Sequence, residues 1–121
     1  MADMGELQAR IQALSDAYAA QLPEKLRQIE EHWAGLGEGV WDEADFETLH
    51  RMVHSLTGSG KTFGFVLLSA AARNLEELLE SVAQAKAGLN EDQRARIEEK
   101  LRELQLAALR QDAGEVAGLE I

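Results

Sequence analysis

The sequence predicts an all-α protein, an antiparallel up-down four-helix bundle. Apolar residues recur every three or four positions along successive stretches of the 121-residue chain, which is the period of an amphipathic helix. The composition is rich in Ala, Leu, Glu, Gln and Arg and includes a single proline, as expected for helices. Short loops separate the stretches, and helices joined by short loops pack as antiparallel neighbours.

The first apolar stripe extends from the N-terminus to a glycine-rich loop. It comprises Leu7, Ile11, Leu14, Tyr18, Leu22, Leu26, Ile29, Trp33 and Leu36. Proline inside a helix removes a hydrogen bond and crowds the preceding turn, so Pro23 predicts a kink or a break near Gln21. The stripe is therefore one bent helix or two helices, and the bundle has four helices or five. Gly35, Gly37 and Gly39 end this element.

The second stripe begins after a loop in which Val40 and Trp41 are expected to cover the end of the bundle. Asp42, followed by Asp45, predicts an N-cap with an acidic first turn. The stripe itself comprises Phe46, Leu49, Val53, Leu56, Gly60 and Phe63, at spacings of 3, 4, 3, 4 and 3. Because His54 follows Val53, it lies about 100° around the helix, on the flank of the buried seam.

Two further stripes complete the bundle. The third comprises Leu68, Ala71, Ala72, Leu75, Leu78, Leu79 and Val82, and the fourth comprises Ile97, Leu101, Leu104 and Ala108. The third helix is expected to end near Lys86 and Gly88, and Asn90 is expected to cap the fourth. The bundle should therefore occupy residues 1–111, and residues 112–121 lose the helical period and form a tail or the start of a linker.

Charge and composition exclude several classes of function. Twelve basic residues against 22 acidic residues give a net charge of -10, and a protein that binds nucleic acid needs a basic surface. No apolar run approaches the 18 residues of a membrane span, so we expect no membrane insertion. There is no cysteine, hence no disulfide framework, which agrees with a cytoplasmic protein.

A nucleotide-binding loop is one possible interpretation of the segment TGSGKT, residues 57–62. The full phosphate-binding pattern needs a glycine where Ser55 stands, and a strand leading into the loop. Here the preceding residues have the helical period instead. The segment is therefore expected to be part of a helix, and the chain should contain no ATP-binding site.

A metal site is a second possible interpretation. His50 and His54 are four residues apart on one helix face, with Glu47 one turn before them. No fourth ligand is evident, because His32 belongs to a different helix. From the sequence alone we expect no metal site and no cofactor in this chain.

A family resemblance gives the third interpretation. HSLTGSGKTFGF at residues 54–65, followed by LLSAAARNLEELLE at residues 67–80, resembles the histidine-containing phosphotransfer (HPt) domain. That family has a histidine, then glycine and small residues within the next two turns, an apolar-Gly pair, and a Leu-Glu pair on the following helix. The resemblance covers roughly residues 8 to 110. The segment TFGF at residues 62–65, with the acidic helix before it, looks most like the P1 domain of CheA-type chemotaxis kinases.

The resemblance implies a phosphoryl carrier of a two-component or chemotaxis pathway. His54 would accept a phosphoryl group from a histidine kinase catalytic domain, acting in cis or in trans, and would donate it to the aspartate of a CheY-like receiver domain. ATP would be bound by the kinase and Mg²⁺ by the receiver.

The resemblance also assigns roles to residues around the histidine. Glu76 would accept the N–H of the inner ring nitrogen, which orients the ring and makes the outer nitrogen more basic. Arg73 could pair with Glu76 or with the phosphoryl group. Thr57 stands where the family has a lysine, and Lys61, two turns after His54, could supply the missing positive charge.

The receiver is expected to dock over the face that surrounds His54. Its surface would comprise His50, Arg51 and Gly58 on the exposed flank of the second helix, with Ser69 and Glu80 on the matching flank of the third. Glycine keeps this surface low, so that a partner can approach closely. The missing lysine at Thr57 supports an alternative, in which the chain is a degenerate bundle that only docks a partner and carries no phosphate.

Overall fold

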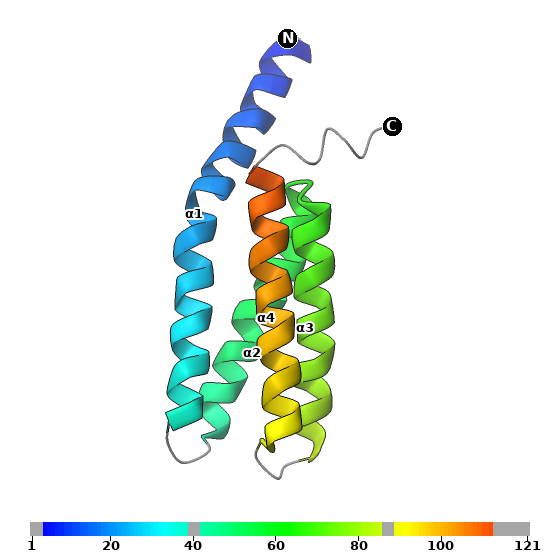
Figure 1. The fold of residues 1–121 in the computed structure, drawn as a ribbon. Coiled ribbons are helices and arrows are strands. Elements are labelled where there is room, and N and C mark those ends of the chain that lie inside the picture. Colours follow the sequence, from blue (N-terminus) through cyan, green and yellow to red (C-terminus); the bar gives the residue numbers. More distant parts are fainter. Residues whose placement is uncertain (1–3, 39–41, 86–88, 113–121) are drawn as a thin grey trace.

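The computed structural model describes residues 4–38, 42–85 and 89–112. These ranges form α1 (Met4–Glu38), α2 (Glu43–Thr62), α3 (Val66–Ala85) and α4 (Glu91–Asp112), and they include no strand. Successive helices run in opposite directions along the bundle (Figure 1). The predicted all-α, up-down four-helix bundle is confirmed.

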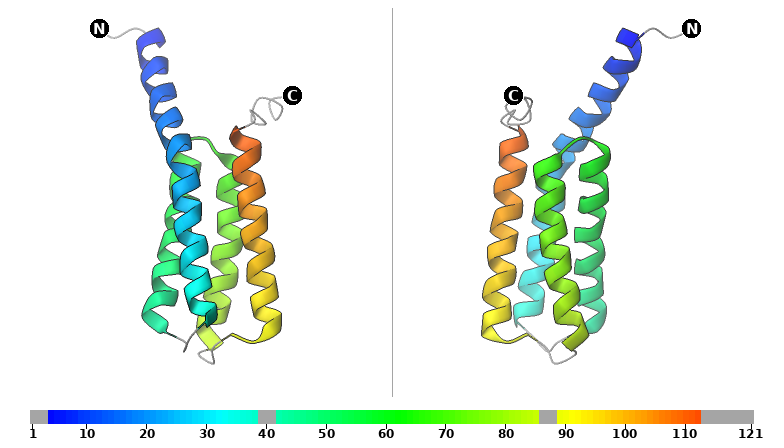
Figure 2. Two further views of the ribbon diagram at one scale, coloured as in Figure 1. Left: turned by 60° about the vertical axis from the view of Figure 1, so that its left-hand side comes forward. Right: turned by 90° about the vertical axis from the view of Figure 1, so that its right-hand side faces the viewer.

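The first helix passes through Pro23 without a break. It is a single helix of 35 residues, so the bundle has four helices rather than five. By contrast, α2 and α3 have 20 residues each and α4 has 22. The N-terminal part of α1 therefore extends beyond the end of the bundle and leans away from it (Figure 2).

This difference in length corrects one expectation about the first apolar stripe. Leu7, Ile11 and Leu14 are 48%, 55% and 59% exposed, although they continue the buried face of α1. At their level no described helix is present for them to pack against. The stripe first enters the core at Tyr18, which is buried.

The core lies among the four helices where they overlap. The seam of α2 is buried as predicted from Phe46 to Gly60, and so are most of the predicted inward residues of α3 and α4. Phe63, Ala71 and Leu78 are only partly buried and pack against the edge of the core. Its fully buried large side chains are Leu22, Ile29, Leu49, Val53, Leu56, Leu68, Leu75, Leu79, Ile97 and Leu104. Each such side chain contributes roughly 1.5–3 kcal/mol of hydrophobic free energy.

The N-terminal caps of α2 and α4 act as the sequence predicts, whereas the prediction that Gly35 and Gly37 end the first helix is wrong, because α1 continues through them to Glu38. The side chain of Asp42 accepts hydrogen bonds from the backbone N–H groups of Ala44 and Asp45 at 2.8 and 3.3 Å. Asn90 and Gln93 exchange hydrogen bonds between side chain and backbone at the start of α4. These caps satisfy N–H groups that a helix start would otherwise leave without partners.

A tight turn joins α2 to α3. Gly64 adopts a φ of 82°, a left-handed conformation that glycine tolerates best. The backbone N–H of Phe65 donates a 2.7 Å hydrogen bond to the carbonyl oxygen of Gly60, which closes the end of α2. The turn sets the register between α2 and α3, and the candidate site lies on these two helices.

Several expectations fall outside the described residues. They concern the positions of Val40 and Trp41, the end of the third helix at Lys86 and Gly88, and the tail after residue 112. Within the described ranges, no helix is long and apolar enough to cross a membrane.

Candidate functional site

His54 projects from the flank of α2 toward solvent. Its neighbour in sequence, Val53, is fully buried, whereas the His54 side chain is 70% exposed. The nitrogen Nδ1 of His54 is hydrogen-bonded to the carboxylate oxygen Oε2 of Glu76 on α3. Thus the exposed ring is held from one side by a group on the neighbouring helix.

The contact with Glu76 determines which ring nitrogen can react. A carboxylate accepts hydrogen bonds, so the shared proton belongs to Nδ1 of His54. The opposite nitrogen, Nε2, then keeps its lone pair and lies on a ring that is mostly exposed. A histidine with one nitrogen fixed by a carboxylate and the other unprotonated is arranged as a nucleophile or a base.

Glu76 is itself held firmly by its surroundings. It is 9% exposed and lies beside the buried Leu75 on α3. A buried carboxylate needs a hydrogen-bond partner, because removing it from water without one is costly. Its contact with His54 meets that need, and the loss of the contact would leave an unpaired acid at the helix interface.

His50 lies one turn before His54 on α2. The two imidazole rings are nearly parallel, with an interplanar angle of 17° and centroids 6.4 Å apart. Nε2 of His50 lies 3.3 Å from Oε1 of Glu80 on α3. His50 and Glu80 both belong to the predicted docking surface, and in the structure they contact each other.

Two glycines of α2 serve different purposes. A Cβ atom on Gly58 would have no neighbouring atom within 4 Å, so this position leaves open space next to the histidine. A Cβ atom on Gly60 would lie 3.3 Å from the backbone nitrogen of Ser69. Gly60 therefore allows α2 and α3 to pass close together, whereas Gly58 keeps the surface low.

Thr57 and Ser69 connect the two helices behind the histidine. Ser69 Oγ donates a 2.7 Å hydrogen bond to the carbonyl oxygen of Thr57, and both residues are half-buried. The hydroxyl of Thr57 donates to the carbonyl oxygen of Val53 at 3.3 Å. These two positions contribute to helix packing, and Thr57 brings no positive charge to the site.

The basic residues of the site take different positions. Arg73 forms an ion pair with Glu77 at 3.3 Å, on the exposed face of α3, and not with Glu76, which was one of its two expected partners. Arg51 donates to Thr48 Oγ1 at 3.3 Å and lines a groove between α1 and α2. Lys61 is exposed at the end of α2 and forms no ion pair within the described ranges.

One contact near the site was not anticipated from the sequence. The hydroxyls of Tyr18 on α1 and Ser59 on α2 are 2.6 Å apart. The Tyr18 ring stacks on Phe63 with centroids 4.8 Å apart and meets the edge of Phe65 at 5.2 Å. Burial raises the pKa of Tyr18, and the hydrogen bond with Ser59 opposes this rise. These contacts join α1 to the turn after α2, and only their spatial proximity identifies them.

The nucleotide-loop interpretation does not fit this geometry. Residues 57–62 lie within helix α2, which ends at Thr62. A phosphate-binding loop needs several free backbone N–H groups pointing at the phosphates, and a helix interior uses those groups in its own hydrogen bonds. The segment TGSGKT is therefore part of the helix that carries His54.

Comparison with protein-family models identifies the class to which this bundle belongs. The model of the Hpt domain matches residues 4–112, most of the chain. The chain belongs to the histidine phosphotransfer domain family. Domains of this family accept phosphoryl groups from kinases and pass them to response-regulator receivers in phosphorelay signalling. Searches of curated proteins and of solved structures found no significant match.

Proposed function

We propose that His54 is the phosphoryl-accepting residue of this domain. The observation that carries the proposal is the hydrogen bond from Nδ1 of His54 to the nearly buried carboxylate of Glu76. The bond fixes the proton on the inner nitrogen and leaves Nε2 as the nucleophile. Neither His50 nor His32 combines such a contact with a ring as exposed as that of His54.

The transfer consists of two balanced steps. In the first, the lone pair of His54 Nε2 attacks the γ-phosphorus of ATP held by a kinase, an N–P bond forms and the P–O bond to ADP breaks. The ring then carries a positive charge, which the carboxylate of Glu76 stabilises through the N–H of Nδ1. In the second, a receiver aspartate oxygen attacks phosphorus, the N–P bond breaks and its electron pair returns to Nε2.

The chain itself supplies positioning rather than charge neutralisation. Thr57 adds no cation beside the histidine, and Arg73 pairs with Glu77. Lys61 lies two turns after His54, is exposed and forms no ion pair within the described ranges, so it is the candidate for contact with the phosphoryl group. The Mg²⁺ of the receiver and the ATP-binding site of the kinase supply the remaining requirements of in-line transfer.

The partner kinase and receiver are proposed from the sequence resemblance. We propose a CheA-type chemotaxis pathway, with the kinase catalytic domain in cis or in trans and a CheY-like receiver. The support is the segment TFGF at residues 62–65, which forms the α2–α3 turn, and the acidic α1. A docking surface around His54 would include His50, Gly58 and Glu80.

The experiment is phosphorylation by a histidine kinase catalytic domain with radiolabelled ATP. The expected product carries phosphate that is labile in acid and stable in base, as for phosphohistidine. His54→Gln should remove the label while leaving helicity and thermal stability nearly unchanged, because an exposed residue contributes little packing and the glutamine amide can still donate to the Glu76 carboxylate. His32→Gln, a histidine on α1, is the matched control and should label normally.

Equal labelling of His54→Gln and the wild type would refute the assignment of His54. A wild type that binds the receiver but never carries phosphate would favour the docking-only alternative. The absence of a basic residue at Thr57 is the observation that favours this alternative. Thr57→Lys would then test whether the missing lysine is the cause. A phosphotransfer site that degenerated through loss of this lysine should regain labelling.

A further inference from the structure

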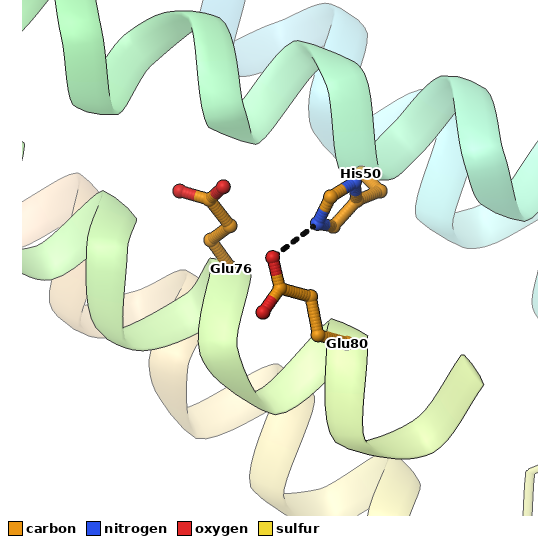
Figure 3. Close-up of side chains that lie close together, drawn as sticks. All are labelled: His50, Glu76 and Glu80. Atoms are coloured by element: carbon orange, nitrogen blue, oxygen red, sulfur yellow. Dashed lines mark hydrogen bonds and ion pairs between the residues drawn. The ribbon is translucent and has the colours of Figure 1, made fainter. Parts of the chain in front are cut away.

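Three potential metal ligands from two helices converge beside the histidine site. His50 comes from α2, and Glu76 and Glu80 come from successive turns of α3 (Figure 3). One ligand atom from each of the three residues lies within 4.8 Å of the others. This set differs from the one that the sequence suggested, because both carboxylates come from the helix opposite His50.

The spacing of His50 and Glu80 is that of a long hydrogen bond, and it also suits two ligands of one metal ion. Their nearest atoms are 3.3 Å apart, whereas such hydrogen bonds are typically about 2.9 Å long. Zinc binds imidazole nitrogen and carboxylate oxygen at about 2.0–2.2 Å, so two ligands at a tetrahedral angle lie roughly 3.4 Å apart. The separation observed therefore already matches one edge of a coordination tetrahedron.

The charge and accessibility of this cluster also favour a cation. The carboxylates of Glu76 and Glu80 lie beside His50, Glu76 also contacts His54, and Arg73 on α3 is paired with Glu77. Glu80 is exposed, so rotation of its side chain can bring its carboxylate closer to Glu76. A hollow lined by Phe46, Glu47, His50, Glu80, Ala83 and Gln84 lies next to the cluster and gives room for coordinating water.

We propose that His50, Glu76 and Glu80 form a binding site for a divalent transition-metal ion of the zinc class. One imidazole with two carboxylates is a ligand set that suits zinc, whereas Mg²⁺ and Ca²⁺ prefer oxygen ligands alone. Three protein ligands leave at least one coordination position for water. Glu76 contributes one oxygen to the metal while Oε2 still accepts from Nδ1 of His54.

The metal site is coupled to His54 through Glu76. A metal ion withdraws electron density from the carboxylate that it binds, so Glu76 becomes a weaker acceptor for the N–H of His54. Nε2 of His54 is then less nucleophilic, and the positive charge of a phosphorylated ring is less well stabilised. Zinc should therefore slow phosphorylation of His54, a regulatory effect that rests on the proposed function.

The binding itself is tested by titrating the purified chain with Zn²⁺ in a calorimeter. We expect one ion per chain, and at least tenfold weaker binding for His50→Gln and for Glu80→Gln. Two matched controls, Glu77→Gln on the same helix and His32→Gln on α1, should bind like the wild type. Equal zinc affinity of His50→Gln and the wild type would overturn the site, as would equal affinity for Ca²⁺ and Zn²⁺.

A second readout identifies the ligands directly. The ring ¹⁵N resonances of His50 should shift on addition of Zn²⁺, while those of His32 should not. If the His32 resonances shift as much as those of His50, zinc binds the acidic surface without selectivity and the site is refuted.

Coupling is tested by comparing phosphorylation rates with Zn²⁺ and with a chelator. For the wild type, we expect the rate with Zn²⁺ to be at most a third of the rate with chelator. For Glu80→Gln, the ratio of these two rates should be near one. The ratio is taken within each variant, so a change in the basal rate cancels, and zinc inhibition of the kinase would affect both variants. Equal ratios would refute the coupling. Failure of the proposed function would give a different result from failure of the metal site. His54→Gln would then label like the wild type, while calorimetry still reported zinc binding.

Discussion

The backbone of Gly60 passes so close to that of Ser69 that a Cβ atom on Gly60 would lie 3.3 Å from the Ser69 nitrogen. Two hydrogen bonds hold Ser69 in place. The N–H of Ser69 donates to the carbonyl oxygen of Phe65 at 2.9 Å, and its hydroxyl donates to Thr57 at 2.7 Å. The contact sets the spacing of α2 and α3 next to His54.

Alanine at the two glycines of α2 should therefore have different effects on stability. Gly58→Ala should raise the free energy of unfolding by up to about 1 kcal/mol, because alanine favours an exposed helix position. Gly60→Ala gains the same propensity but pushes against the backbone of Ser69, at a cost of roughly 1–3 kcal/mol. Urea denaturation measures both, and a Gly60→Ala variant as stable as Gly58→Ala would show that α3 can move away.

Gly58→Leu tests the docking surface without disturbing the fold. A leucine side chain would project into open space beside His54 and raise the surface that a receiver has to cover. We expect transfer from the phosphorylated domain to the receiver to slow at least tenfold, with stability equal to or above that of the wild type. Ser81→Leu, on an exposed face of α3, is the control. Transfer at the normal rate by Gly58→Leu would show that the receiver does not approach over this face.

Glu76 should act on the reactivity of His54 rather than on binding of the partner. Glu76→Ala removes the acceptor of the Nδ1 proton, so the ring should populate both tautomers and phosphorylation should slow about tenfold or more. Ring ¹⁵N chemical shifts report the tautomer, and radiolabelling reports the rate. Glu77→Ala, an exposed neighbour on α3, should leave both unchanged. Identical tautomer populations in Glu76→Ala and the wild type would make Glu76 a bystander.

Tyr18 provides a prediction about alkaline pH. Its folded-state pKa is raised by burial, so its neutral form favours the folded state. This contribution is complete below the unfolded pKa of about 10 and is lost as the pH rises through the higher folded pKa. Phenolate absorbance should therefore appear at higher pH in the folded than in the denatured protein. Denaturation by urea should show that Tyr18→Phe loses less stability than the wild type as the pH rises past this range.

Much of the fold follows from local patterns. The spacing of Leu49, Val53 and Leu56 defines the buried face of α2, and the same spacing places His54 on its flank. Helix geometry fixes these directions within a few turns, whatever the rest of the chain does. The caps at Asp42 and Asn90 are local for the same reason, because each side chain bonds the backbone two or three residues away.

The candidate site was predictable only in part. The offset between His54 and Glu76 came from the resemblance to a family, and the structure brings these two residues into contact. Arg73 was expected to choose between Glu76 and the phosphoryl group, yet it pairs with Glu77, one turn away on its own helix. An exposed arginine reaches several carboxylates at similar cost, so the sequence does not decide among them.

By itself, the sequence predicted a bundle of four or five amphipathic helices, most of their inward faces, and a histidine beside a glycine on one flank. Tertiary structure alone decided that Leu7, Ile11 and Leu14 are exposed, because their burial depends on where the other helices end. It also decided that Ser69 bonds to Thr57, and that His50 meets Glu80. Helical periodicity gives the direction of each side chain around its own axis. The relative axial position of two helices depends on packing between residues distant in sequence, and that packing brings the site together.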